Sequence, residues 1–256
     1  MDKGSGYGVK EVAEIIFINL DTGKPELFLD ALKMSNLTNE GQTVFINGGQ
    51  GSQRLLGWDF GRTSEMTMQD ALLNPKAISV AMGTNLTVGV ANVYNREVLT
   101  AVDNAAVIQV TLSETPILKG TPAEDIDGVY KTTDGYEHTT EILPASYSVA
   151  AKVITLSAGV AAGEKVIVYY EYATAATAQT VTIDADKFSA YYKVIGTTVV
   201  RNLNGTDEPF QIIIPKAKFK PGFNITLDAE NPSVFDFGLD IFKAPNEQVM
   251  VKLVKY

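Results

Sequence analysis

The chain has 256 residues, no cysteine and a formal net charge of −9. This composition excludes disulfide bonds and thiolate metal sites, and it disfavours binding to a nucleic-acid backbone, which requires clustered Lys and Arg. No run approaches the ~20 apolar residues of a membrane-spanning helix, and residues 1–9 are too polar for the apolar core of a signal peptide. We therefore expect a soluble protein that is synthesised in a cytoplasm.

The N-terminal part of the sequence predicts short strands joined by polar turns. Residues 10–20 contain the apolar run Ile15–Ile18, and residues 27–32 and 43–46 are further strand candidates. The Gly-rich segment 47–51 lacks the Lys-Ser/Thr pair of a phosphate-binding loop, so it is interpreted as a tight connection. Residues 54–60 are expected to be extended.

A single helix is predicted over residues 64–73. Met68, Ala71 and Leu72 recur at helical spacing. Asn74-Pro75 is expected to end the helix, because the residue before a proline is disfavoured in helical conformation. In this interpretation Ala71 and Leu72 are buried against a sheet.

The middle of the chain predicts an inserted β module. A Pro/Gly-rich shift in composition at residues 113–124 and an Ala/Thr-rich linker at 173–178 place the module at residues 103–177, inside a discontinuous core of residues 1–102 and 178–256. Short strands spaced about 8–12 residues apart are typical of a sandwich. The strands expected in the module are residues 107–112, 129–131, 137–142, 149–156 and 165–172.

The C-terminal third has the clearest strand pattern. Apolar residues alternate with polar ones over residues 235–241, and again over 216–220 and 223–230. Pro221-Gly222 predicts a turn that folds the last two segments into an antiparallel hairpin. Because the apolar positions are all odd-numbered, an odd loop or a β-bulge is required to keep them on one face, with Phe219 opposite Phe223. The predicted fold class is all-β with one short helix.

Candidate chemistry is weak throughout the sequence. His138 is the single histidine and is interpreted as a solvated surface residue. Residues 125–128 (Asp-Ile-Asp-Gly) resemble part of a calcium loop but lack its glutamate. Trp58 and the eleven tyrosines could form a sugar platform, although their scatter fits strand packing better. The carboxylate pairs fit solvated strand faces or turns: Asp184 with Asp186, Asp207 with Glu208, and Asp236 with Asp240. We assign no catalytic, cofactor-binding or metal-binding residue.

The order of these features resembles that of the major tail proteins, the tail tube subunits of tailed bacteriophages. The resemblance is carried by Asn47-Gly48-Gly49-Gln50-Gly51, by the segment 62–73 that follows, by the end of the inserted module at residues 163–172, and by the closing strands from Pro209 to Phe242. It spans most of the chain and is one of layout rather than of a short motif.

The resemblance implies a β-sandwich or barrel-like core packed against one helix. It also implies hexameric rings of the protein itself, stacked into a hollow tube through which genome DNA passes without specific binding. Partners would be other tail proteins, such as the tape measure, the terminator and a sheath, with no membrane, no cofactor and no enzymatic activity. The location would be the virion tail, and an acidic lumen would suit the charge of −9.

Two other functions fit the sequence. One is a different virion component, such as a capsid decoration protein. The other is a carbohydrate-binding module or glycosidase, which would need clustered aromatic residues beside a carboxylate pair.

Overall fold

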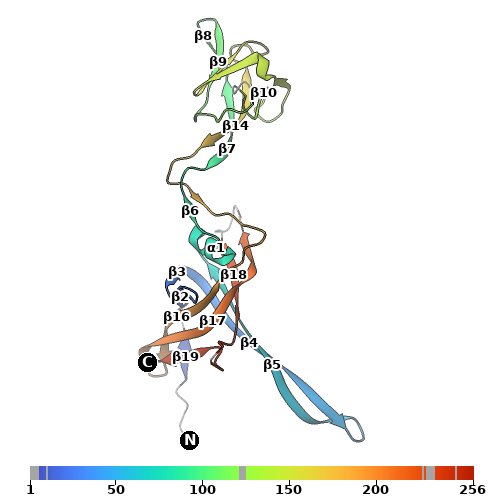
Figure 1. The fold of residues 1–256 in the computed structure, drawn as a ribbon, viewed down its shortest axis with the longest axis vertical. Helices are drawn as coiled ribbons and strands as arrows, with labels where there is room; N and C mark the ends of the chain where they lie inside the picture. The colour runs from blue at the N-terminus through green and yellow to red at the C-terminus, as the bar shows by residue number, and fades with distance from the viewer. Residues whose placement is uncertain (1–5, 10, 121–124, 227, 229–233, 246) are drawn as a thin grey trace. The chain divides into compact units, whose positions relative to one another are not determined.

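The computed structural model describes residues 6–9, 11–120, 125–226, 228, 234–245 and 247–256. It is an all-β fold with several antiparallel sheets and, in these residues, one α-helix (Figure 1). The predicted fold class is confirmed.

The chain divides into two compact units. Unit 1 consists of Met1–Leu86 and Val181–Tyr256, and unit 2 is Thr87–Thr180. The sequence boundary at residues 102 and 103 falls inside unit 2, because the strand Asn92–Thr100 pairs along its whole length with Lys165–Ala173.

In the described part of unit 1, nine strands form one antiparallel sheet. Seven of them follow the order β3-β2-β16-β17-β18-β5-β4, while β1 pairs with β16 and β19 pairs with β17 (Figure 1). The strands are β1 (Tyr7–Val9), β2 (Glu14–Asn19), β3 (Pro25–Leu29), β4 (Leu32–Gly48), β5 (Gln53–Asp70), β16 (Tyr191–Asn202), β17 (Asp207–Thr226), β18 (Val234–Ile241) and β19 (Lys252–Lys255).

The core of unit 1 lies on one face of this sheet. Phe235, Phe237, Leu239 and Ile241 of β18 are buried, as their alternation predicts, and they pack in one cluster with apolar residues of the neighbouring strands. The helix α1 (Pro75–Met82) adds its own buried residues to that cluster and contacts β3 and β17.

The predicted helix over residues 64–73 is wrong, because these residues lie largely in strand β5 and the helix begins at Pro75. The Asn74 side chain accepts hydrogen bonds from the backbone N–H groups of Lys76 and Ala77 at 3.0 and 3.4 Å. Asn74 is thus an N-cap, and Pro75 occupies the first helical turn, where its missing N–H costs nothing. Leu72, expected in the core, is 65% exposed.

The predicted turn at Pro221-Gly222 is also wrong, because both residues lie within the single strand β17. Phe219 pairs with Leu239 and Phe223 with Phe237 of β18, so three residues of β17 stand opposite Gly238 in a β-bulge. The register shifts by an even number of residues across the bulge, so odd-numbered side chains stay on the core face, as expected for a bulge. The expected pairing of Phe219 with Phe223 is wrong, because both residues belong to β17 and pair with β18. Of the expected second segment, residues 227, 229 and 230 lie outside the described residues.

Unit 2 is built from two four-stranded antiparallel sheets that enclose one core. Their orders are β11-β10-β14-β7 and β12-β13-β9-β8, and a third, two-stranded sheet pairs β15 with β6. The bounds are β6 (Thr87–Val88), β7 (Asn92–Thr100), β8 (Val102–Asn104), β9 (Val107–Thr111), β10 (Gly128–Thr132), β11 (Thr140–Ile142), β12 (Tyr147–Ala150), β13 (Val153–Leu156), β14 (Lys165–Ala173) and β15 (Gln179–Thr180), with a 3₁₀ turn at Pro144–Ser146.

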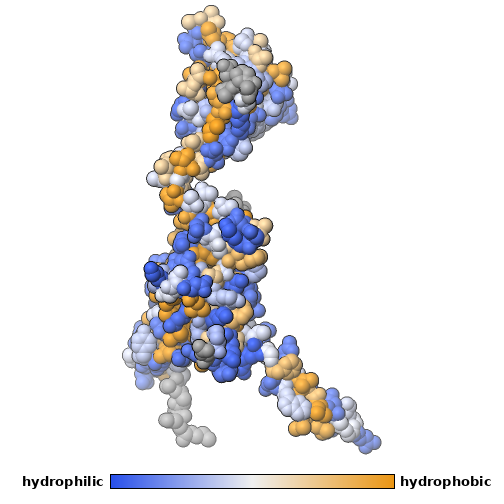
Figure 2. All heavy atoms as spheres, in the orientation of Figure 1, coloured by the Kyte–Doolittle hydropathy of each residue, from blue (hydrophilic) through white to orange (hydrophobic). Residues whose placement is uncertain are grey.

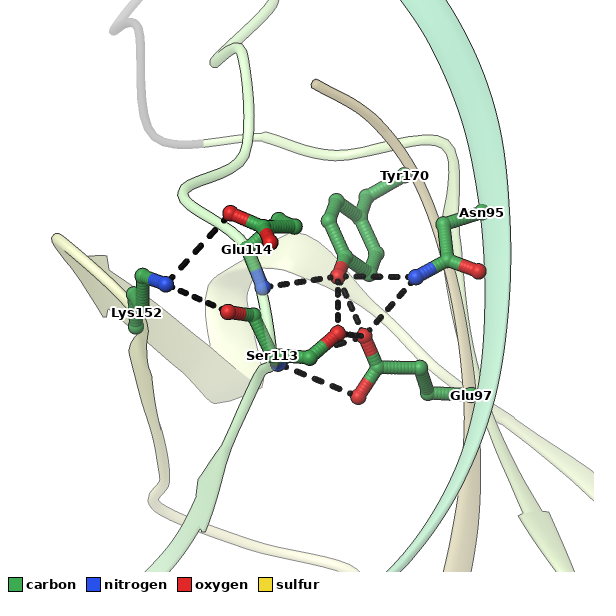
Figure 3. Close-up of polar contacts among 6 residues, drawn as sticks. All are labelled: Asn95, Glu97, Ser113, Glu114, Lys152 and Tyr170. Carbon is green, nitrogen blue, oxygen red and sulfur yellow. Dashed lines mark hydrogen bonds and ion pairs between the residues drawn. The ribbon is translucent and has the colours of Figure 1, made fainter. Parts of the chain in front are cut away.

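A polar cluster joins the end of β9 to β7 and β14 (Figure 3). The fully buried Tyr170 donates its hydroxyl hydrogen to Glu97 and accepts from the Asn95 amide at 3.1 Å and the Glu114 backbone N–H at 3.2 Å. The Glu97 carboxylate also accepts from the backbone N–H and the hydroxyl of Ser113. The cluster therefore fixes the segment that leaves β9 against the other sheet, which contains β7 and β14.

Candidate assembly surface

The most exposed part of unit 1 is the outer portion of the β4–β5 hairpin, residues 42–60, which we call the hairpin arm. Strand β5 pairs with β18 only over residues 64–70, whereas the arm residues pair only with one another in the described structure. The tip carries Gly49 and Gly51 at φ 79° and 90°, a left-handed conformation that glycine adopts without strain. The predicted tight connection at residues 47–51 thus includes this tip.

One face of the hairpin arm is apolar. Val44 pairs with Trp58 and Ile46 with Leu56, so these four side chains lie on the same face. Trp58 is 51% exposed, Leu56 59% and the neighbouring Phe60 53%. Figure 2 shows hydrophobic residues gathered over this hairpin. We call Val44, Ile46, Leu56, Trp58 and Phe60 the apolar arm face.

On the opposite face of the arm, the side chains contact one another. The guanidinium carbon of Arg54 lies 4.0 Å from the centre of the Phe45 ring, a cation–π contact. The hydroxyl of Thr43 donates to Asp59 at 2.6 Å. Gly57 stands opposite Phe45, and a Cβ there would lie 3.0 Å from that ring. Phe45 therefore lies flat across the arm, and most of the arm's exposed large apolar side chains belong to the apolar arm face.

The arm has no core of its own to stabilise it. A two-stranded hairpin is marginally stable in water, and five large apolar side chains on one face add an unfavourable hydration term. Burying the exposed half of each of these side chains in an interface would stabilise that interface by about 1 kcal/mol per side chain, or roughly 5 kcal/mol in total. Such a surface is expected to be buried against another molecule.

A second apolar surface crosses the sheet of unit 1 on the side away from its core. The pairing registers align Phe28 of β3, Ile16 of β2, Ile195 of β16 and Ile213 of β17 in one row. Phe28 is 50% exposed, and the three isoleucines are half-buried. A cavity of about 330 Å³ lies beside Phe28 and Ile16. This outer apolar row is a further candidate contact between subunits.

The same side of the sheet carries a network of opposite charges. Lys220 pairs with Glu65 and lies 3.7 Å from Asp240, and its hydrogen bond with Glu65 raises the pKa of Lys220. Asp236 accepts from the amide of Gln69 at 2.8 Å. Lys220 offsets the charge of one carboxylate, and the Gln69 amide hydrogen-bonds Asp236 without neutralising it.

The candidate residues of the sequence do not form a catalytic or metal centre in the described structure. His138 is exposed and belongs to unit 2, and Trp58 belongs to the hairpin arm of unit 1. In the calcium-like segment, Asp125 accepts from the Tyr147 hydroxyl at 2.5 Å and Asp127 pairs with Lys119 at 2.7 Å. Within the described residues, no three His, Asp or Glu side chains gather where they could hold a metal ion.

Each carboxylate pair has at least one member that meets a cation or an amide. Asp184 pairs with Lys187 at 2.5 Å, Asp207 with Arg201 at 2.5 Å, and Glu208 with Lys255. The hydrogen bond from Lys255 lowers the pKa of Glu208. Sequence reasoning missed the hairpin arm, whose signal was the clustering of Val44–Ile46 and Leu55–Phe60 on either side of a Gly-rich tip.

Among the described residues, no helix has the length and apolar character needed to cross a membrane. A search of curated proteins finds no match to the chain. A family model described as the YomU/Tube protein family matches residues 7–255, which is nearly the whole chain. Phage tail tube proteins are structural components of the virion tail. The chain therefore belongs to the YomU/Tube protein family, a family of phage tail tube proteins.

Proposed function

We propose that the protein is a tail tube subunit that assembles with copies of itself into hexameric rings, which stack into a hollow tube for the passage of genome DNA. The proposal takes the family, which matches residues 7–255, as its starting point. The observation that carries the proposal is the apolar arm face, which is exposed to water in a single chain. In a tube, a neighbouring copy of the protein would cover this face.

The hairpin arm is well suited to reach a neighbouring subunit. Strand β5 continues past the end of its pairing with β18, and β4 pairs with it to the tip, so the apolar arm face is not shielded by the described residues of its own sheet. The outer apolar row offers a second uncovered surface on the same unit. A heterologous contact, in which one patch meets a different patch on the next copy, produces closed rings or open tubes.

The charge distribution suits a channel that DNA crosses without sticking. Unit 1 has 16 Lys and Arg against 19 Asp and Glu, a net charge of −3, and unit 2 has 5 against 11, a net charge of −6. Neither unit has the excess of cations that binding to phosphates requires. Six copies in a ring would multiply this negative charge and repel DNA.

In this function the protein works without a catalytic step. Its partners are other copies of itself and the tail proteins that set the length and end of a tube, such as a tape measure and a terminator, with a sheath if the tail contracts. The protein acts in the virion after synthesis in the host cytoplasm.

Negative-stain microscopy of the concentrated protein tests the proposal. The parent chain is expected to form tubes of constant diameter. The double variant Leu56→Ser, Trp58→Ser removes two large groups from the apolar arm face, at about 1 kcal/mol each, which should raise the concentration needed for assembly by about 30-fold.

The matched control is Phe45→Ser, on the opposite face of the same arm. This variant is expected to assemble at close to the parent's concentration. A parent chain that stays monomeric at high concentration would overturn self-assembly. Tubes from the double variant at the parent's concentration would overturn the role of the arm, and discrete particles of fixed size would favour a capsid decoration protein.

A further inference from the structure

Unit 2 carries a cluster of aromatic rings that its core does not use. In the sheet β11-β10-β14-β7, Val129, Val166 and Val168 point into the core. The alternate positions lie on the other face of the sheet, and they include Tyr130 of β10, Tyr169 of β14 and Arg96 of β7, which pairs with Tyr169. Ile167, opposite Tyr130 on this face, is fully buried. The loop after β10 adds His138 to the same side. We call Arg96, Tyr130, His138 and Tyr169 the aromatic face.

The rings of the aromatic face are held in a fixed arrangement. The His138 ring stacks on Tyr130 at 4.2 Å between centroids and 10° between planes. Tyr169 stands at 76° to both rings, with its centroid 5.5 Å from that of His138 and 6.1 Å from that of Tyr130. The hydroxyl of Tyr169 hydrogen-bonds His138 Nε2 at 3.0 Å and accepts from Arg96 Nε at 3.2 Å. A ligand would meet surfaces that are already ordered, which lowers the entropic cost of binding.

The aromatic face also has unused polar capacity. Arg96 is exposed and donates to two neutral acceptors, the Tyr169 hydroxyl and the Gly135 carbonyl oxygen. A guanidinium has five N–H donors, so donors remain for a ligand. Glu141 stands opposite Tyr130 on the neighbouring strand and is exposed. Neither Arg96 nor Glu141 forms an ion pair with the residues that the structure describes, so a donor and an acceptor flank the stacked rings.

Charge narrows the class of ligand. Unit 2 has a net charge of −6, from 5 Lys and Arg and 11 Asp and Glu, and so repels polyanions. The Arg96 guanidinium, hydrogen-bonded to the central Tyr169, disfavours a cation. A neutral sugar is neither a polyanion nor a cation. The C–H groups on one side of a pyranose pack on an aromatic ring, and its hydroxyls both donate and accept hydrogen bonds.

We propose that the aromatic face of unit 2 is a binding platform for neutral pyranose sugars. The His138 ring, whose other side is covered by Tyr130, supplies the stacking surface. Arg96 donates to sugar hydroxyls and Glu141 accepts from them. An open platform surrounds little of its ligand, so a single copy binds weakly, with a dissociation constant on the order of 1 mM. This site goes beyond the tube function and does not depend on it; many copies in one assembly would add avidity.

The test is saturation-transfer NMR and titration of the full chain with maltopentaose, cellopentaose and chitopentaose as neutral probes and a polygalacturonate fragment as the anionic comparison. At least one neutral probe is expected to bind with a dissociation constant on the order of 1 mM, and the anionic probe is expected not to bind. Arg96→Met removes the donors but keeps the aliphatic stem, and Tyr130→Ser with His138→Ser removes the stacked pair. Each change should weaken binding at least about tenfold.

The control is Tyr256→Ser, which removes a tyrosine that is 65% exposed in unit 1. It should leave the titration unchanged. Circular dichroism in the tyrosine region verifies that each variant is folded, and Arg96→Met, at an exposed position, provides the test if the double variant does not fold. The proposal is overturned if no neutral probe binds at about 10 mM, if the anionic probe binds better, or if Arg96→Met binds as the parent does.

Discussion

Removing one hydroxyl from the polar cluster of unit 2 should destabilise that unit measurably. In Tyr170→Phe the Glu97 carboxylate loses a hydrogen-bond donor, and the Glu114 backbone N–H loses its acceptor. The Tyr170 side chain is fully buried, so water does not easily take the place of the hydroxyl. A hydrogen bond to a charged group contributes about 1.5–3 kcal/mol, and we expect a loss of about 2 kcal/mol.

Urea unfolding followed by near-UV circular dichroism measures this loss, because seven of the eleven tyrosines lie in unit 2. With an m-value of about 1.5 kcal/mol/M, a loss of 2 kcal/mol lowers the midpoint by about 1.3 M. Tyr172→Phe is the matched control, since its ring packs against the same core but its hydroxyl has no hydrogen-bond partner among the described residues. Equal midpoints for the two variants would refute the reasoning.

Three further predictions concern single positions. Asn74→Ala should cost about 1 kcal/mol in thermal unfolding by removing the cap of α1, whereas Asn74→Asp should cost little, and equal losses would contradict the capping role. Leu72→Asp should change stability by less than about 0.5 kcal/mol, because Leu72 is exposed; a large loss would restore its place in the core. Hydrogen bonds from the backbone N–H groups of Tyr136 and Glu137 lower the pKa of Asp134. The stabilisation of this loop is therefore present above the unfolded-state pKa of about 3.9 and lost as the pH falls through the lower folded value. Amide protection factors at residues 136 and 137 should fall in that range in the parent and not in Asp134→Asn; a parent without that fall would disprove the link.

The strands that cover a core could be predicted from the sequence, because burial on one side forces an alternating pattern. Phe235–Ile241 shows this in unit 1, and Val166, Val168 and Tyr170 show it in unit 2. The hairpin arm could not be predicted in the same way. Both of its faces are exposed in the single chain, so its apolar residues do not follow burial by the chain's own core.

The wrong predictions of a helix over residues 64–73 and of a turn at Pro221-Gly222 have local causes. In β5 the buried side chains alternate as Ser64, Met66, Met68 and Asp70, and the two polar members obscure the strand pattern. In addition, each of the two dipeptides, Asn-Pro and Pro-Gly, is compatible with two different local structures. Asn-Pro ends one helix or begins another, and Pro-Gly makes a turn or sits in a β-bulge. Only the pairing partner, which is distant in sequence, decides between them.

The aromatic face combines residues that are distant in sequence. His138 and Tyr169 are 31 positions apart, and Arg96 is 73 positions from Tyr169. Sequence analysis named His138 and the tyrosines separately but had no means to place them on one sheet. A position on β14 meets one on β7 only through the antiparallel register.

The pairing of Thr87 with Thr180 has a practical consequence for protein engineering. The chain enters unit 2 and leaves it on two paired strands, so the two crossing points lie about 5 Å apart. Any foreign domain whose ends are equally close can be exchanged for unit 2 without stretching the chain on either side. Thr87 and Thr180 thus mark an insertion site at which each copy of the protein can display one foreign domain.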